Sequence, residues 1–178
     1  MNGESSYRRF LDGDESAASE IIREYRESLT FFTYRYVKDV TVAEDIAIDV
    51  FAELFTYRKR YNFKASLKTF LFTVARSKAL NHIKRSKIIT FTELTGQEAD
   101  TALTPESHLL QKEKNYLLHK AIDTLPEDMK TAVHLIYFDE MSYSEAARVM
   151  KKKEKQIDNL LYRAKAILRK TLDGEYIK

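Results

Sequence analysis

The sequence contains no cysteine, and only four glycines and two prolines occur among its 178 residues. Without cysteine, disulfide bonds and thiolate metal sites are excluded. Glycine and proline interrupt helices, so their scarcity, together with 32% charged residues, predicts a soluble helical protein. No two of the four histidines are three or four residues apart, so a zinc site is not indicated. We therefore expect no metal and no other cofactor.

Long apolar segments are also missing. No run of 18 apolar residues exists, and the N-terminal segment MNGESSYRRF lacks the apolar core of a signal peptide. These features predict a cytoplasmic protein that does not bind a membrane directly. A chain of this length with 44% hydrophobic residues can form one medium domain or two small ones.

Charge is sorted along the chain, although the net charge is only +3. Residues 54–92 contain ten basic residues and no acidic one, and residues 93–106 contain four acidic residues and no basic one. Residues 151–170 are basic again, with eight basic residues against two acidic ones. Two cationic blocks separated by an anionic segment predict two nucleic-acid-binding modules, joined by a linker that avoids the polyanion.

In the first half, hydrophobic spacing predicts three helices. After the polar residues 12–15, apolar residues recur at three- and four-residue steps as far as Tyr36. Thr41 and Glu44 form the pattern of a capping box for a second helix. The buried stripe of that helix is predicted to be Ala43, Ile46, Ala47, Val50 and Leu54. A loop is expected at 57–63, followed by a third helix capped by Ser66.

In the second half, four helices are predicted, over residues of about 106–124, 127–138, 142–150 and 154–172. Pro105 suits the first position of a helix, and Ser142 with Glu145 forms a capping box. No strand alternation and no internal repeat is found. The predicted fold is therefore all-α, with two small helical domains. We expect an N-terminal helical bundle over residues 1–88, a flexible acidic linker over 89–105, and a C-terminal helix-turn-helix bundle over 106–178.

The segment 142–170 has the spacing of a helix-turn-helix: a short capped helix, a three-residue turn and a longer amphipathic helix. Ala146 and Ala147 are small enough for the helices to cross closely, with Ile157 and Leu161 filling the crossing. The candidate DNA-binding residues on the outer face are Lys151, Lys152, Lys153, Lys155, Gln156, Asn159 and Arg163. Cations suit phosphates and guanine, and the amides suit adenine edges. A helical hairpin with a solvated basic face explains the same pattern.

A second candidate site combines cations with aromatic residues. Cations follow phosphates, and aromatic rings offer stacking surfaces to unpaired bases, so the segment suits single-stranded or melted nucleic acid. Its candidate residues are Tyr57, Arg58, Arg60, Tyr61, Asn62, Phe63, Lys64, Arg76 and Lys84. In the alternative interpretation, the three rings of the loop pack beneath a solvated cationic face.

The helix at 43–55 carries acidic residues four apart and more apolar residues than one core contact needs. Such a surface suits a protein partner. The candidate residues are Asp45, Ile48, Asp49, Phe51 and Glu53. Alternatively, the first helix covers the additional apolar residues.

No catalytic constellation is found. The chain has no Gly-rich phosphate loop and no Ser or His in a nucleophile motif. His134 lies in an apolar run and is expected to be packed rather than to act as a base. We expect a protein that is not an enzyme.

Four blocks of sequence follow one another in a characteristic order: AEDIAIDVFAELF (43–55), SLKTFLFTVARSKALNHIKR (66–85), LPEDMKTAVHLIYFDEMSYSEAARVM (125–150) and QIDNLLYRAKAILRK (156–170). Through these blocks, and over nearly its whole length, the chain resembles the extracytoplasmic-function (ECF) group of bacterial sigma factors. The resemblance implies a factor that binds core RNA polymerase through the 43–55 helix and opens the minus-ten element with residues 57–85. The 154–170 helix would recognise the minus-thirty-five element, and the linker would run near the RNA exit path.

Several positions depart from the family pattern. Ile48 stands where the family usually has Gln, Asp49 replaces Glu, and Ser77 replaces a frequent Asn. Lys151 begins the turn where Gly is usual, which leaves the conformation of the turn open. Asp158 and Asn159 replace more commonly basic or hydroxyl residues, so no promoter preference is carried over.

The implied partners are core RNA polymerase and promoter DNA, with the free protein a monomer. Members of this group are commonly held inactive by an anti-sigma factor, which is often membrane-anchored. The alternative function is a stand-alone helix-turn-helix regulator with a sensing or dimerising N-terminal domain. Against it, a sensor domain has no reason to be free of acidic residues over residues 54–92. The other alternative is an RNA-binding or RNA-modifying helical protein, and an RNA-modifying enzyme would need a catalytic cluster.

Overall fold

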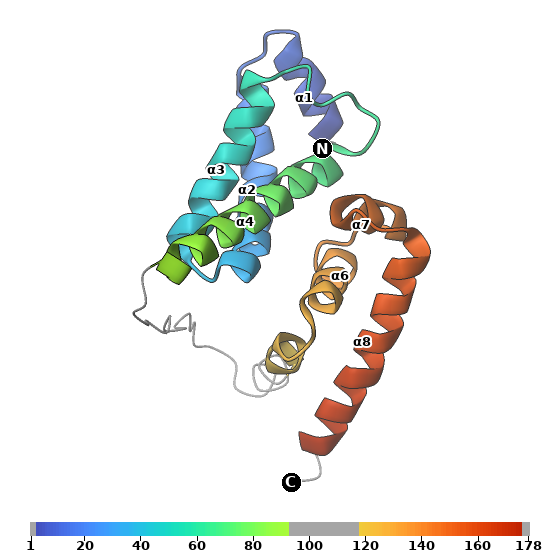
Figure 1. Ribbon diagram of the computed structural model, residues 1–178. Coiled ribbons are helices and arrows are strands. Elements are labelled where there is room, and N and C mark those ends of the chain that lie inside the picture. Colours follow the sequence, from blue (N-terminus) through green and yellow to red (C-terminus); the bar gives the residue numbers. More distant parts are fainter. Residues whose placement is uncertain (1–2, 93–117, 176–178) are drawn as a thin grey trace, which may run out of the picture. The chain divides into compact units, whose positions relative to one another are not determined.

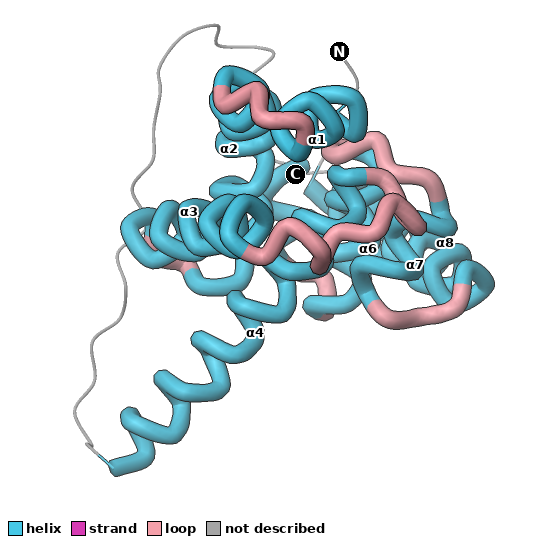
Figure 2. The backbone as a smooth tube through the Cα atoms, turned by 90° about the horizontal axis from the view of Figure 1, so that it is seen from above, coloured by secondary structure: helices cyan, strands magenta, loops and turns pink. Residues whose placement is uncertain are grey.

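The computed structural model describes the backbone of residues 3–92 and 118–175 and the side chains of residues 3–86 and 118–172. The chain divides into two compact units, residues 1–99 and 100–178 (Figure 1). Every element in the described ranges is a helix, and short loops join successive helices within each unit (Figure 2). This confirms the predicted all-α fold with two helical domains. Residues 93–105, most of the predicted linker, lie outside the described ranges.

Unit 1 consists of four helices: α1 (Gly3–Leu11), α2 (Ser16–Val37), α3 (Val40–Thr56) and α4 (Leu67–Thr92). Helix α2 packs against each of the other three, α3 packs against α4, and α1 touches α4. The core is aromatic as well as aliphatic, with the rings of Phe32 and Phe72 4.9 Å apart between α2 and α4. Helix α4 extends four residues into the segment that we predicted as linker.

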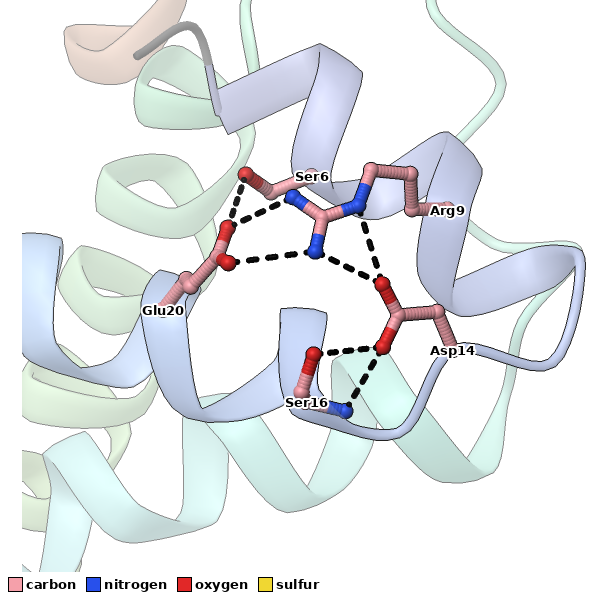
Figure 3. A network of polar contacts seen from close by, with 5 residues as sticks. All are labelled: Ser6, Arg9, Asp14, Ser16 and Glu20. Atoms are coloured by element: carbon pink, nitrogen blue, oxygen red, sulfur yellow. Dashed lines mark hydrogen bonds and ion pairs between the residues drawn. The ribbon is translucent and has the colours of Figure 1, made fainter.

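Helix α1 was not predicted from the sequence, and it is held to the start of α2 by a polar network (Figure 3). The Arg9 guanidinium donates to Asp14 at 2.6 and 2.9 Å and to Glu20 at 3.0 and 3.1 Å. Ser6 also donates to Glu20, and the Ser16 N–H and hydroxyl donate to Asp14. One guanidinium thus joins two carboxylates across the turn at residues 12–15.

The start of α3 corrects one prediction. The N-cap is Asp39, whose side chain accepts a hydrogen bond from the Val42 N–H at 3.0 Å, whereas Thr41 lies inside the first turn. The reason is the preceding residue: Lys38 ends α2 in the left-handed conformation, with φ 58°. Asp39 is therefore already extended and placed to cap. The predicted buried stripe of α3 and the Ser66 cap of α4 are both confirmed.

Unit 2 contains helical residues 118–123, then α6 (Glu127–Tyr137), α7 (Tyr143–Met150) and α8 (Glu154–Glu175). The capping box of Ser142 and Glu145 is present at the start of α7. Helices α6, α7 and α8 pack against one another, and Ala146, Ile157 and Leu161 are buried at the crossing, as predicted. The first part of the helix predicted at 106–124 lies outside the described residues.

Candidate nucleic-acid and polymerase interfaces

The turn between α7 and α8 is closed by a lysine in a conformation usually left to glycine. Lys151 has φ 54° and ψ 45°, the left-handed helical region. Its N–H donates to the Arg148 carbonyl at 3.2 Å, and the Lys152 N–H donates to the Ala147 carbonyl at 2.9 Å. This pair of hydrogen bonds is a Schellman motif, which satisfies the last carbonyls of α7. The turn therefore keeps helix-turn-helix geometry without glycine.

The outer face of α8 presents the predicted DNA-binding side chains to solvent. Lys151, Lys153, Lys155, Gln156, Asn159 and Arg163 are all exposed. The Gln156 side chain accepts a hydrogen bond from the Lys153 N–H at 2.8 Å, which caps the start of α8 and leaves its amide nitrogen to donate. Lys152 is less exposed because its ammonium lies 2.9 Å from the Asp128 carboxylate on α6. A shallow hollow is lined by Lys152, Gln156, Asn159, Leu160 and Arg163.

Tyr162 belongs to the same solvent-exposed face and was not among the predicted site residues. Its side chain is 76% exposed, the largest exposure of the large apolar and aromatic residues in the described ranges. It lies three residues after Asn159, one helical turn further along α8. That spacing was the sequence signal that could have identified it.

The aromatic residues of the 57–64 loop do not behave alike. Tyr57 is 63% exposed, whereas Tyr61 is 4% exposed. The Tyr61 hydroxyl donates to the Ala65 carbonyl at 2.8 Å, and its ring lies 5.3 Å from that of Tyr7 and 5.2 Å from that of Phe70. Burial raises the pKa of Tyr61 to about 12. The prediction that Tyr61 stacks on DNA bases does not fit this position, because its ring is part of the core.

Phe63 and Asn62 shape the loop rather than lie free in solvent. Phe63 is half-buried, has φ 59°, and its ring lies 4.7 Å from that of Tyr61. The Asn62 side-chain oxygen accepts from the Lys64 N–H at 3.1 Å, a local turn that such side chains favour. The side chain of Asn62 nevertheless remains exposed.

The predicted cations of unit 1 are mostly on the surface. Arg58, Arg60, Lys64 and Lys84 are exposed, and Arg76 is half-buried in α4. Arg60 forms an ion pair with Glu53 of α3, so it is tied to its own unit as well as being exposed. The cationic surface therefore extends from the loop onto α4.

The acidic face of α3 is smaller than predicted. Asp45, Ile48 and Asp49 are exposed, with Ile48 at 58%. Phe51 is buried, and its ring stacks beside that of Phe55, which in turn lies 4.8 Å from the ring of Phe10 of α1. The prediction that Phe51 belongs to an exposed surface was wrong, because its side chain is 4% exposed.

Glu53 is also turned inward. Its side chain is 14% exposed and lies between Arg60 and the Lys78 ammonium, 3.2 Å away. Lys78 also lies 3.4 Å from Asp49. Glu53 thus links α3 to the loop and to α4 and is less exposed than Asp45 and Asp49, and its predicted role in polymerase binding stays a prediction.

The described residues show neither a metal site nor a membrane-spanning helix. Within these ranges, no group of three or more metal-ligating side chains is gathered. Among the same residues, no helix is long and apolar enough to cross a membrane. His134 is buried and stacks on Phe138 at 4.6 Å, as expected for a packed histidine.

Comparison with known protein families matches two segments of the chain. Residues 21–88 match the family described as Sigma-70 region 2, and residues 116–168 match Sigma-70, region 4. The first match covers most of α2, all of α3 and most of α4, and the second covers α6, α7 and most of α8. Helix α1 precedes the first match.

Individual relatives are similar along almost their whole length. The chain is 29% identical to the RNA polymerase sigma-H factor of Pseudomonas aeruginosa, over 92% of this chain and 90% of that protein. It is 24% identical to the ECF RNA polymerase sigma factor SigW of Bacillus subtilis, over 90% of this chain and 91% of that protein.

Among solved structures, the sigma factor RpoE, crystallised with the anti-sigma factor NepR from Bartonella quintana, has a similar fold. The TM-score is 0.69 at 20% identity, with 87% of this chain and 96% of that chain covered. Each of the two matched sigma-70 regions lies on one helical unit, and the chain is similar to sigma factors over almost their whole length. The chain therefore belongs to the ECF group of bacterial RNA polymerase sigma factors.

Proposed function

We propose that this protein directs core RNA polymerase to specific promoters by binding DNA with two separate cationic surfaces. The observation that carries the proposal is that each sigma-70 region matches one unit, and each unit exposes cations at the position of the match. The protein has no catalytic role of its own and acts in the cytoplasm, where polymerase and promoter DNA meet. We propose the functional division 1–88, 89–105 and 106–178.

Unit 2 recognises the minus-thirty-five element as closed duplex. The exposed face of α8 enters the major groove, with Lys155, Gln156 and Asn159 facing base edges. Lys151, Lys153 and Arg163 contact phosphates, and Lys152 contributes less because Asp128 already neutralises it. The left-handed turn at Lys151 supports this assignment, since it fixes the angle between α7 and α8.

Unit 1 binds the minus-ten element once its strands separate. Tyr57 is the exposed ring of the loop and stacks on an unpaired base. Arg58, Lys64 and Lys84 follow the phosphates, with Arg60, Asn62 and Arg76 at the edges of the same surface. Tyr61 and Phe63 support this surface from beneath.

The contact with core polymerase is made by the exposed end of the acidic face on α3. Asp45 and Asp49 offer negative charge on either side of the exposed apolar side chain of Ile48. Acidic groups around an apolar centre are typical of a protein interface. Core polymerase then brings both DNA-binding units to one promoter and raises their effective concentration.

An anti-sigma factor, membrane-anchored or not, is the expected regulator of a monomeric protein of this kind. Two solved structures with a similar fold contain a bound partner protein: RpoE with the anti-sigma factor NepR, and CnrH with the cytosolic domain of CnrY. The exposed Ile48 face offers an apolar surface that a regulator can cover in competition with polymerase.

A pull-down with purified core RNA polymerase tests the polymerase contact. We expect the wild-type protein to be retained and Asp45→Arg/Asp49→Arg to lose most of its binding, because both reversed charges lie on the exposed face. The matched control is Asp12→Arg/Glu27→Arg, which reverses two exposed carboxylates outside α3. Equal retention of both double variants would show that α3 is not the polymerase contact, and no retention of any form would contradict the proposed function.

A further inference from the structure

Helix α1 lies outside the matched sigma-70 region, yet its side chains contact both ends and the middle of the loop between α3 and α4. We propose that α1 is a positioning element that holds residues 57–66 in the shape that binds unpaired DNA bases. The inference rests on the proposed function of this loop and adds to it a part of the chain that the family match does not include.

Tyr7 ties α1 to the start of the loop. Its side chain is fully buried, and its hydroxyl lies 3.2 Å from the Leu54 carbonyl and 3.0 Å from the Arg58 carbonyl. A phenol has one proton, which both carbonyls share at the end of α3. The guanidinium of Arg58 lies over the ring of Phe10, 4.6 Å from its centroid. The backbone and the side chain of Arg58 are therefore both oriented by α1.

Glu4 ties α1 to the other end of the loop. Its carboxylate accepts a hydrogen bond from the Leu67 N–H at 2.5 Å. Leu67 is the first residue of α4, and its N–H has no acceptor within the helix. A carboxylate at this position also interacts favourably with the positive end of the helix dipole. The last loop residue and the start of α4 are therefore fixed by a side chain 63 positions earlier in the chain.

The middle of the loop is held from the same side. The Arg8 guanidinium lies over the ring of Phe63 at 4.4 Å, and the rings of Tyr7 and Phe63 are 5.9 Å apart. Phe63 needs this support, because a non-glycine residue with φ 59° is unfavourable unless its surroundings fix it. Among the described residues, few backbone hydrogen bonds lie within the loop itself. One of them runs from the Arg60 N–H to the Tyr57 carbonyl at 2.8 Å.

Helix α1 can act in this way because it is itself fixed on α2. The Arg9 network joins it to Asp14 and Glu20 (Figure 3). At its other end, Gly3 packs so closely on Tyr25 that a Cβ atom would overlap the tyrosine hydroxyl. A loop whose shape is set before DNA binds loses less conformational freedom on binding, so more of the contact energy is available to separate the strands.

The test uses Tyr7→Phe and the double variant Tyr7→Phe/Glu4→Met in the full-length chain. Tyr7→Phe removes the hydrogen bonds to the Leu54 and Arg58 carbonyls, and the double variant also removes the acceptor of the Leu67 N–H, while both keep side chains of similar size in α1. The matched control is Thr33→Val, which removes a buried hydroxyl that donates to the Leu29 and Ala43 carbonyls, away from the loop.

The first measurement is independent of function. The loop contains Arg58, Lys59, Arg60 and Lys64, four sites for trypsin. We expect cleavage at these sites to be roughly threefold faster or more in the double variant than in the control, because local opening exposes them. Cleavage at the control's rate would overturn the positioning role of α1, whatever the protein does with DNA.

The second measurement compares transcription by the holoenzyme from a duplex promoter and from the same promoter with an unpaired minus-ten segment. We expect the variants to lose roughly fivefold or more on the duplex and to recover on the unpaired template, with polymerase retention unchanged. Full activity of the variants on the duplex would overturn the inference. If the wild-type holoenzyme itself transcribes neither template, the proposed function fails, and the trypsin result still decides whether α1 holds the loop.

Discussion

Tyr57 and Tyr61 are four positions apart in one loop, and their different burial gives them different roles. Tyr61→Ala should lower the free energy of unfolding by about 3–5 kcal/mol, since it removes a buried ring from the core. Tyr57→Ala should change it by less than about 0.5 kcal/mol, as for most surface changes. Urea unfolding of the two variants measures this difference.

On DNA binding, the substitution of Tyr57 should have the larger direct effect, because Tyr57 is the exposed ring. In the holoenzyme, Tyr57→Ala should weaken binding of a single-stranded minus-ten oligonucleotide by about 1–3 kcal/mol, the loss of one stacked base. Tyr57→Phe is the control, because it keeps the ring. Unchanged binding by Tyr57→Ala would remove Tyr57 from the proposed site.

Lys151 combines an unfavourable backbone conformation with an exposed charge. Lys151→Gly should stabilise unit 2 by about 0.5–1 kcal/mol, because glycine accepts the left-handed conformation that costs other residues about 1–2 kcal/mol. The same change should weaken DNA binding and lower the salt dependence of log K by about 0.9, the effect of one lost phosphate contact.

Thermal unfolding and a salt titration of DNA binding measure the two effects of Lys151→Gly separately. Lys38→Gly, at another left-handed lysine, is the matched control for stability and should leave DNA binding unchanged. Lower stability of Lys151→Gly would contradict the structural role given to this position.

For single residues, the sequence predicted the chemistry of a site better than the exposure of its members. Periodicity indicates which side of a helix is buried, but the 57–66 loop has no period, so Tyr57 and Tyr61 could not be separated. Phe51 was misplaced for another reason: α3 has more apolar residues than one buried stripe accounts for, and their spacing did not show that Phe51 is 4% exposed while Ile48 is 58% exposed.

Helix α1 was missed because its buried face does not look hydrophobic. That face consists of Gly3, Ser6, Tyr7 and Phe10, so half of it is glycine and serine. The spacing is helical, but the pattern in the segment GESSYRRFL is too short and too polar to show it. The longer helices α2, α3 and α8 were predicted well, since each presents several large apolar residues at helical spacing to a core.

The junction between α1 and α2 should make unit 1 sensitive to acid. The hydrogen bond from Ser16, followed by that from Arg9, holds the pKa of Asp14 below its ordinary value of 3.8. Arg9, followed by Ser6, holds the pKa of Glu20 below 4.5. Because the folded state favours both charged forms, their stabilisation is present above these ordinary values and is lost as the pH falls below them.

Urea unfolding between neutral pH and about pH 3 tests this, comparing wild type with Asp14→Asn/Glu20→Gln. The wild type should be the more stable protein at neutral pH, and the two curves should converge in acid. The control, Asp12→Asn/Glu27→Gln, changes two exposed carboxylates that take no part in the network. A constant difference across the pH range would show that the network is not the source of the acid sensitivity.

At the scale of the whole molecule, the division into two units corresponds to the charge pattern of the sequence. The two cationic blocks lie on two different helical units, and each unit matches one sigma-70 region. Hydrophobic spacing was sufficient to predict the all-α fold class, whereas the segment 142–170 was also compatible with an ordinary helical hairpin until the family resemblance was considered. The acidic segment 93–106 lies outside the described residues, so its proposed place near the RNA exit path stays a prediction.

The departures from the family pattern are compatible with this organisation. Lys151 maintains the turn in place of glycine. Ile48, in place of the usual Gln, gives α3 an exposed apolar residue between Asp45 and Asp49. We propose that the polymerase contact is consequently more apolar than in relatives that carry an amide at this position. Asp158 and Asn159 are exposed on α8, so the expectation that no promoter preference is carried over from the family is unchanged.

Sequencing of the transcripts made by purified core RNA polymerase on genomic DNA, with and without the protein, is the most direct test. We predict a new set of discrete transcript starts that share two upstream sequence elements at constant spacing. These starts should disappear with Asp45→Arg/Asp49→Arg and persist with Asp12→Arg/Glu27→Arg. The same transcript starts with and without the wild-type protein would contradict its role as a promoter-directing sigma factor.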